Sequence, residues 1–142
     1  MPVRELVQVR YRLLEGEESA TSAAILGESH DFGGELVLGF RDGHEVFVSW
    51  VGDPVQYAIG AREDSHFRAD AALSEHDVSD SRMWRELLGC DVSFRFTAAD
   101  NQILEISSIE DRVLVCAFEC GHWWADALTI CRQEPAPYDV RT

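Results

Sequence analysis

Lysine is absent from this 142-residue chain, so all twelve of its basic residues are arginines. Twenty-six acidic residues oppose them, which gives a formal net charge of −14 at pH 7. So negative a surface repels the phosphates of nucleic acids and anionic lipid headgroups, and it attracts basic molecules. The shortage of positive charge therefore excludes nucleic-acid and membrane-surface binding and favours a basic protein as the partner.

Long apolar runs and asparagine are also scarce. No apolar segment approaches the roughly 18 residues of a membrane span, and the N-terminus lacks the apolar centre of a signal peptide. Asn101 is the one asparagine, whereas Ala, Arg, Gly, Val, Asp and Glu are abundant. This usage is typical of GC-rich codons, so we expect a bacterial protein that lies in the cytoplasm. Its four cysteines would then be reduced, although their even number leaves disulfides open for a secreted protein.

Catalytic and cofactor-binding motifs are missing. Gly33-Gly34 lacks the spaced glycines and the Lys-Ser/Thr pair of a phosphate-binding loop. Ser29-His30-Asp31 does not make a triad, because neighbouring side chains diverge and real triads combine distant segments. We expect a polar loop there. The sequence thus predicts a protein that is not an enzyme and that needs no cofactor.

The spacing Cys116-x3-Cys120-x-His122, with Cys131 downstream, is the one arrangement that suggests a metal site. On an extended strand, Cys116 and Cys120 would lie about 13 Å apart at ~3.3 Å per residue. Two ligands at that distance do not share one zinc ion. We therefore expect buried structural thiols and no bound metal.

The composition is that of one folded domain. Hydrophobic residues make up 46% of the chain, with four Trp and seven Phe, which is more than an acidic disordered segment contains. We expect a single domain over residues 1–134. Residues 135–142 include two prolines and are expected to form a flexible C-terminal tail.

Alternation of apolar and polar residues predicts mostly antiparallel β structure. Within residues 6–13, for example, Val7, Val9, Tyr11 and Leu13 would share one face. Eight segments are expected to be strands: residues 6–13, 35–41, 44–51, 55–62, 90–97, 102–107, 112–120 and 123–132.

Asp42-Gly43 predicts a hairpin with a two-residue type I′ turn. Such a turn would pair Leu38 with Phe47 in the flanking strands. Both faces of this hairpin carry apolar residues, which predicts that it is covered on both sides or lies inside a barrel or sandwich.

One short helix is expected near residues 81–88, with Met83 and Leu87 facing the core and Gly89 ending it. It would separate two three-stranded meanders. A shift of 69 residues aligns the two, which suggests a pseudo-repeat, although any two meanders align about as well. The expected class is α+β, with a large curved sheet, a barrel or a sandwich.

Most of the negative charge lies in two connections. Residues 15–35 contain six acids and no base, and residues 63–80 contain six acids and one arginine. A pair of adjacent tryptophans adds an anchor, because neighbours on a strand face opposite sides and one is then exposed. The expected partner-binding residues are Glu15, Glu17, Glu18, Glu28, Asp31, Glu63, Asp64, Asp70, Glu75, Asp77, Trp123 and Trp124.

Several short motifs resemble those of small uncharacterised bacterial proteins, some of which look like immunity proteins encoded beside polymorphic toxins. The likeness extends over about residues 30–132. Its motifs are turns, core aromatics and a helix stop: residues 36–43, 48–50, 57–60, 77–79 and 84–89. The resemblance implies an inhibitor that binds a basic toxin and offers no catalytic residue.

Two other classes of function stay open. One is a small ligand-binding or hydrolytic β-barrel enzyme with a pocket between the meanders, where His66 and His76 could serve with nearby acids. The other is a structural or accessory domain that forms a homodimer through a sheet edge.

Overall fold

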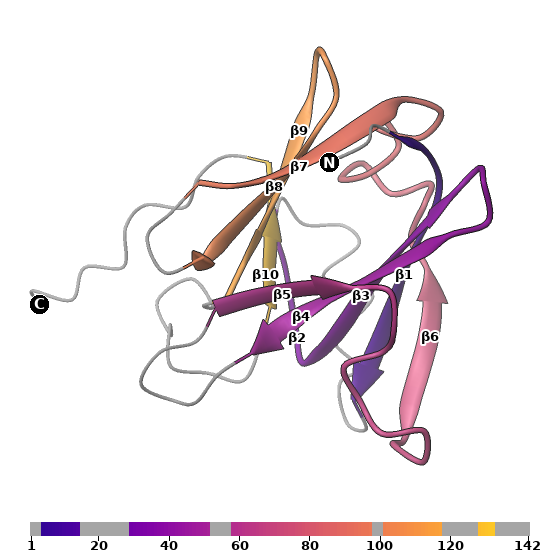
Figure 1. Cartoon of the computed structure of the whole chain (residues 1–142), viewed down its shortest axis with the longest axis vertical. Helices are drawn as coiled ribbons and strands as arrows, with labels where there is room; N and C mark the ends of the chain where they lie inside the picture. The colour runs from indigo at the N-terminus through magenta and orange to yellow at the C-terminus, as the bar shows by residue number, and fades with distance from the viewer. Residues whose placement is uncertain (1–3, 15–28, 52–57, 98–100, 118–127, 133–142) are drawn as a thin grey trace, which may run out of the picture.

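The computed structural model describes residues 4–14, 29–51, 58–97, 101–117 and 128–132 (Figure 1). Within these ranges the chain forms ten strands and no helix. The strands are β1 (Arg4–Leu14), β2 (Ser29–Phe32), β3 (Gly34–Phe40), β4 (Glu45–Val51), β5 (Ala58–Arg62), β6 (Leu73–Asp77), β7 (Asp91–Phe96), β8 (Ile103–Ser107), β9 (Arg112–Cys116) and β10 (Leu128–Cys131). No described segment is a helix long and apolar enough to cross a membrane.

All the strand pairs are antiparallel, as the alternation predicted. The strand order is β2-β10-β9-β8-β7-β1-β3-β4-β5, and β6 pairs with β1 beside this path. The sheet is not closed, since β2 and β5 stand at opposite ends of the path. It therefore forms two halves joined by β1, one with β6, β3, β4 and β5 and the other with β7 to β10 and β2 (Figure 1).

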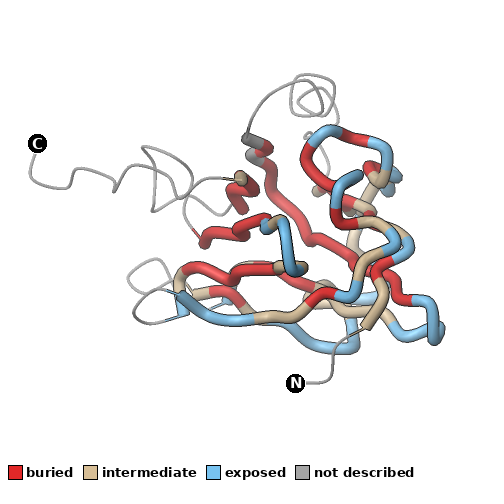
Figure 2. Tube along the Cα trace, turned by 90° about the horizontal axis from the view of Figure 1, so that it is seen from above, coloured by how far each residue is buried: buried red, intermediate tan, exposed pale blue. Residues whose placement is uncertain are grey.

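The larger of the two hydrophobic core clusters lies between the two halves. It combines side chains of β1 and β3, such as Val9 and Leu38, with side chains of β8 and β10, such as Ile106 and Ile130. All four are fully buried. In Figure 2, buried stretches run through the interior and exposed segments lie at the periphery. Burial of apolar area on the facing sides is what holds the halves together.

The chain crosses from one half to the other at Gly33-Gly34, between β2 and β3. Gly34 has φ +153°, and a Cβ placed on it would lie 2.0 Å from the carbonyl oxygen of Arg12. Only glycine allows the backbones of β1 and β3 to approach so closely at this crossing.

A β-bulge in β1 changes its predicted faces. Leu6 pairs with Phe40 and Gln8 with Gly39, so Val7 is an extra residue. Beyond the bulge, Val9, Tyr11 and Leu13 are buried as predicted. Before it, the alternation reverses, and Leu6 is buried while Val7 is 40% exposed.

The predicted register of the β3–β4 hairpin is wrong by one residue. Leu38 pairs with Val46, not with Phe47. The turn has three residues, because Gly43 N donates to Phe40 O (2.9 Å) and Phe40 N donates to His44 O (3.0 Å). Gly43, at φ +91°, supplies the left-handed position that ends such a turn. A shift of one residue moves Phe47 to the face opposite Leu38.

The sequence predicts that both faces of this hairpin are covered. This is confirmed for β3, whose seven residues are all buried. In β4 it holds only for Val48 and Ser49.

The helix expected near residues 81–88 is not confirmed. Residues 82–89 form consecutive turns, with both Trp84 N (3.2 Å) and Arg85 N (3.0 Å) donating to Ser81 O. Gly89 does have a positive φ of +81°, but its N–H donates to Leu6 O of β1 (2.7 Å). The turns still place Trp84 and Leu87 in the core.

Two further features of the strands differ from what the sequence predicts. Residues 73–77, which the sequence places in the acidic connection 63–80, form strand β6 instead. The second meander has four strands, β7 to β10. The pseudo-repeat stays a prediction. In the first meander Leu36 pairs with Val48. The equivalent pair after a shift of 69 residues would be Glu105 with Ala117, whereas Glu105 pairs with Leu114.

Candidate functional site

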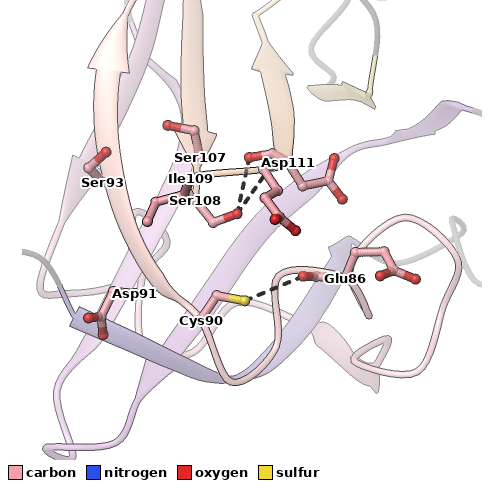
Figure 3. Close-up of a pocket in the computed structure, with 9 residues that line it drawn as sticks. Glu86, Cys90, Asp91, Ser93, Ser107, Ser108, Ile109 and Asp111 are labelled. Atoms are coloured by element: carbon pink, nitrogen blue, oxygen red, sulfur yellow. Dashed lines mark hydrogen bonds between the residues drawn. The ribbon is translucent and has the colours of Figure 1, made fainter.

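A hollow of about 790 Å³ opens between the β8–β9 turn and the segment that leads into β7 (Figure 3). Figure 3 shows Cys90 and Asp91 on one side of it and Ser108 and Asp111 on the other. Four carboxylates, three hydroxyls, one thiol and one isoleucine line it: Glu86, Cys90, Asp91, Ser93, Ser107, Ser108, Ile109, Glu110 and Asp111. Its volume is in the range of ligand pockets, and among the described residues no arginine, lysine or histidine lines it.

The β8–β9 turn is held by its own short polar side chains. Ser108 N donates to Asp111 O (2.8 Å), and Asp111 N donates to Ser108 Oγ (3.2 Å). Asp111 Oδ1 also accepts from Arg112 N (2.9 Å). Ser and Asp stabilise tight turns through such bonds. The turn therefore keeps Ile109 and Glu110 at its tip in a fixed position.

Arg132, just after β10, ties the β8–β9 turn to the 82–89 turns that precede the hollow. Its Nη1 donates to Met83 O (2.9 Å), and its Nη2 forms a short ion pair with Asp111. Cys90 lies on the segment that leads into β7, with its Sγ 3.6 Å from Glu86 O. Cys90 O accepts from Leu6 N (3.0 Å), so β1, the strand that joins the two halves, anchors this side of the hollow.

The carboxylates of the hollow differ in how far they are neutralised. Asp111 is paired with Arg132, and Glu86 lies 3.8 Å from Arg85. Asp91 and Glu110 are exposed, and within the described ranges neither has an arginine nitrogen within 4 Å. Two of the four carboxylates that line the hollow thus carry negative charge that no described arginine neutralises.

Ile109 is the most exposed apolar side chain of the described chain, with a relative exposure of 102%. It stands at the tip of the β8–β9 turn beside the acidic hollow. Isolated exposed apolar residues are common and need no special role. Its position next to a hollow is what makes it a contact candidate.

The sequence-predicted partner residues are only partly visible. Glu15, Glu17, Glu18, Glu28, Trp123 and Trp124 lie outside the described residues, as does the side chain of Asp31. Ser29-His30-Asp31 itself is not a loop but strand β2, and His30 is buried.

Glu63, Asp64 and Asp70 are exposed, as an interaction surface requires. Asp70 lies 3.4 Å from Arg68, and both side chains are largely solvated. Exposed pairs of this kind contribute little to stability. These three acids remain available to a partner.

Glu75 and Asp77 are used within the molecule. Strand pairing sets Glu75 opposite Arg12 and Asp77 opposite Arg10. Glu75 Oε1 accepts from Arg10 Nη1 (2.7 Å), and Asp77 accepts from Gln8 (3.1 Å). Partial burial opposes ionisation of Asp77, but its hydrogen bonds and the charge of Arg10 outweigh this and lower its pKa.

Glu35, the last acid of the first predicted patch, is fully buried. Its carboxylate forms a short ion pair with Arg12 and accepts from Ser65 Oγ (2.7 Å) and His66 N (2.9 Å). The ring of His66 also reaches Phe47 O (2.8 Å). This cluster fastens residues 65–66 to the outer face of β3 and β4 and has a structural role.

The residues of the hollow were missed from the sequence. They lie on segments 86–93 and 107–111, which are separate in the sequence and are brought together by the pairing of β7 with β8. Ile109 was the available signal, because it is an apolar residue within the polar run Ser107 to Asp111. Within the described ranges, no three His, Cys, Asp or Glu side chains group as metal ligands would. Comparisons of the chain with protein-family models, curated proteins and solved structures found no match.

Proposed function

We propose that this chain is a non-enzymatic binding protein of the bacterial cytoplasm that inhibits a basic protein partner, as an immunity protein inhibits its toxin. The observation that supports this most is the acidic hollow, because its described lining includes four carboxylates and no arginine or lysine. The formal net charge of −14 adds a long-range attraction for a basic protein.

The hollow and the turn tip offer complementary contacts to such a partner. An arginine or lysine side chain that enters the hollow would meet Asp91 and Glu110, whose charges are not neutralised by arginines within the described ranges. Ile109 would contact an apolar part of the partner surface. Charged groups at an interface mainly speed association and select the partner, while apolar anchors slow dissociation.

A ligand-binding or hydrolytic enzyme has less support. The described lining of the hollow lies within residues 86–111 and not between the two meanders, and it includes neither His66 nor His76.

The first test identifies the partner and measures its association rate. A basic protein with a toxin-like domain, encoded beside this chain's gene, would be purified and mixed with it in stopped flow at low and high salt. Since the Debye length falls from about 10 Å at 0.1 M to about 3 Å at 1 M, we expect association to slow at least tenfold. A salt-independent rate, or the absence of a basic neighbour, would contradict the proposal.

Two double variants locate the contact face. Asp91→Asn with Glu110→Gln removes two exposed carboxylates at the hollow, and Glu63→Gln with Asp64→Asn removes two on the 63–70 segment. Both change the net charge equally, so they form a matched pair. We expect the hollow variant to slow association more. Equal slowing would show that only net charge matters, and greater slowing by the control would move the face to residues 63–70.

A further inference from the structure

A buried chain of three polar side chains joins β1, β2 and the 82–89 turns. Trp84 Nε1 donates to the hydroxyl oxygen of Tyr11 (2.8 Å), which lies 2.5 Å from Nδ1 of His30. None of the three side chains is more than 1% exposed. The Tyr11 ring also stacks on Phe32, with 4.4 Å between centroids.

The donors and acceptors among Trp84, Tyr11 and His30 determine which ring nitrogen of His30 carries hydrogen. An indole N–H only donates, so the Tyr11 oxygen accepts from Trp84. The Tyr11 hydroxyl must then donate its own hydrogen to another acceptor, and Nδ1 of His30 is the one acceptor within reach in the described ranges. Nδ1 is therefore unprotonated. Burial lowers the pKa of His30 to about 4, so at neutral pH the ring is uncharged and its hydrogen lies on Nε2.

The resulting Nε2–H donor is buried and has no hydrogen-bond partner in the described part of the chain. A buried donor without an acceptor costs about 1–3 kcal/mol. Native proteins almost always satisfy such groups, and internal water does so where no protein group can reach. An anionic acceptor would be costly in this place, because the surrounding core is apolar.

We propose that the protein encloses a binding site for one internal water molecule, which accepts a hydrogen bond from Nε2 of His30. An internal water usually makes about three hydrogen bonds.

Nuclear magnetic resonance tests the tautomer and the water together. In protein labelled with ¹⁵N at histidine, long-range proton–nitrogen correlations at pH 7 should show His30 as the Nε2–H tautomer. Its Hε2 should exchange slowly and give a cross-peak to the water resonance in both NOE and ROE spectra. The Nδ1–H tautomer, or an Hε2 signal without a water cross-peak, would overturn the proposal.

One variant separates this site from a purely structural contact. Tyr11→Phe removes the hydroxyl that fixes the tautomer, so both neutral forms of His30 should become populated. The wild-type measurement decides the water site even where Tyr11→Phe does not fold.

Discussion

His30 should make the stability of the fold depend on pH in a window above that of the carboxylates. Its pKa falls from an ordinary value of 6.5 to about 4 in the folded protein, because burial disfavours the charged ring. A group whose pKa is lower in the folded protein stabilises the folded state at pH values above its pKa in the unfolded chain. This contribution is lost as the pH falls toward the pKa in the folded protein. At about 1.36 kcal/mol per pKa unit, the loss between pH 7 and pH 4.5 is about 2–3 kcal/mol.

The assay is urea denaturation followed by tryptophan fluorescence at several pH values from 7 to 4.5. The matched control is His30→Asn, whose amide oxygen can still accept from Tyr11 but which cannot become charged. We expect the wild-type free energy of unfolding to fall more steeply with decreasing pH than that of the variant. Equal slopes in the two proteins would refute the reasoning. Asp42 and Asp77, whose pKa values are lowered by their hydrogen bonds, should add their losses only at lower pH.

Two further substitutions test the sheet crossing and the buried ion pair, again by urea denaturation. Gly34→Ala should lower the free energy of unfolding by about 3 kcal/mol or more, because the new Cβ would lie 2.0 Å from backbone oxygen. Gly39→Ala is its control and should change little, since the nearest atom is a Gln8 side-chain carbon at 3.5 Å. Glu35→Gln should cost about 2–4 kcal/mol by leaving Arg12 without its buried partner. Glu63→Gln, on an exposed residue, should stay within about 0.5 kcal/mol, and equal losses in either pair would contradict the assignments.

Alternation in the sequence predicted the antiparallel sheet and most of its strands, because half-buried strands must alternate. It did not predict the register of the β3–β4 hairpin, which depends on whether Gly43 alone or Asp42 with Gly43 takes a positive φ. It also missed β6. That strand faces Arg10 and Arg12 through polar side chains, so no apolar alternation marks it.

The expected helix shows how tertiary contacts can override a local pattern. Residues 81–89 have a suitable start, apolar spacing and a glycine stop. In the structure, Leu6 N donates to Cys90 O and Gly89 N donates to Leu6 O, so β1 holds the end of the segment. The chain there satisfies its backbone groups with β1 and with short turns, and the apolar side chains are buried all the same.

The acidic composition predicts a basic partner, and that stays a prediction; it does not indicate which acids would be free to contact one. Glu35, Glu75 and Asp77 belong to the predicted patches, yet arginines of β1 or neighbouring polar groups engage all three. Sequence counts treat each acid as equally available. The ion pairs of the structure show which carboxylates are neutralised, and those of the described residues do not include Asp91 or Glu110.

The place of β1 in the sheet has a consequence for synthesis on the ribosome. This first strand pairs with residues 34–40, 73–77 and 91–92, and β2 pairs with β10 near residue 130. Pairings between such distant segments make folding slow. During translation β1 must wait for much of the chain, with its apolar side chains accessible to chaperones. We expect nascent chains that stop before β10 to remain protease-sensitive, and native structure to form only once residues 128–131 have left the exit tunnel.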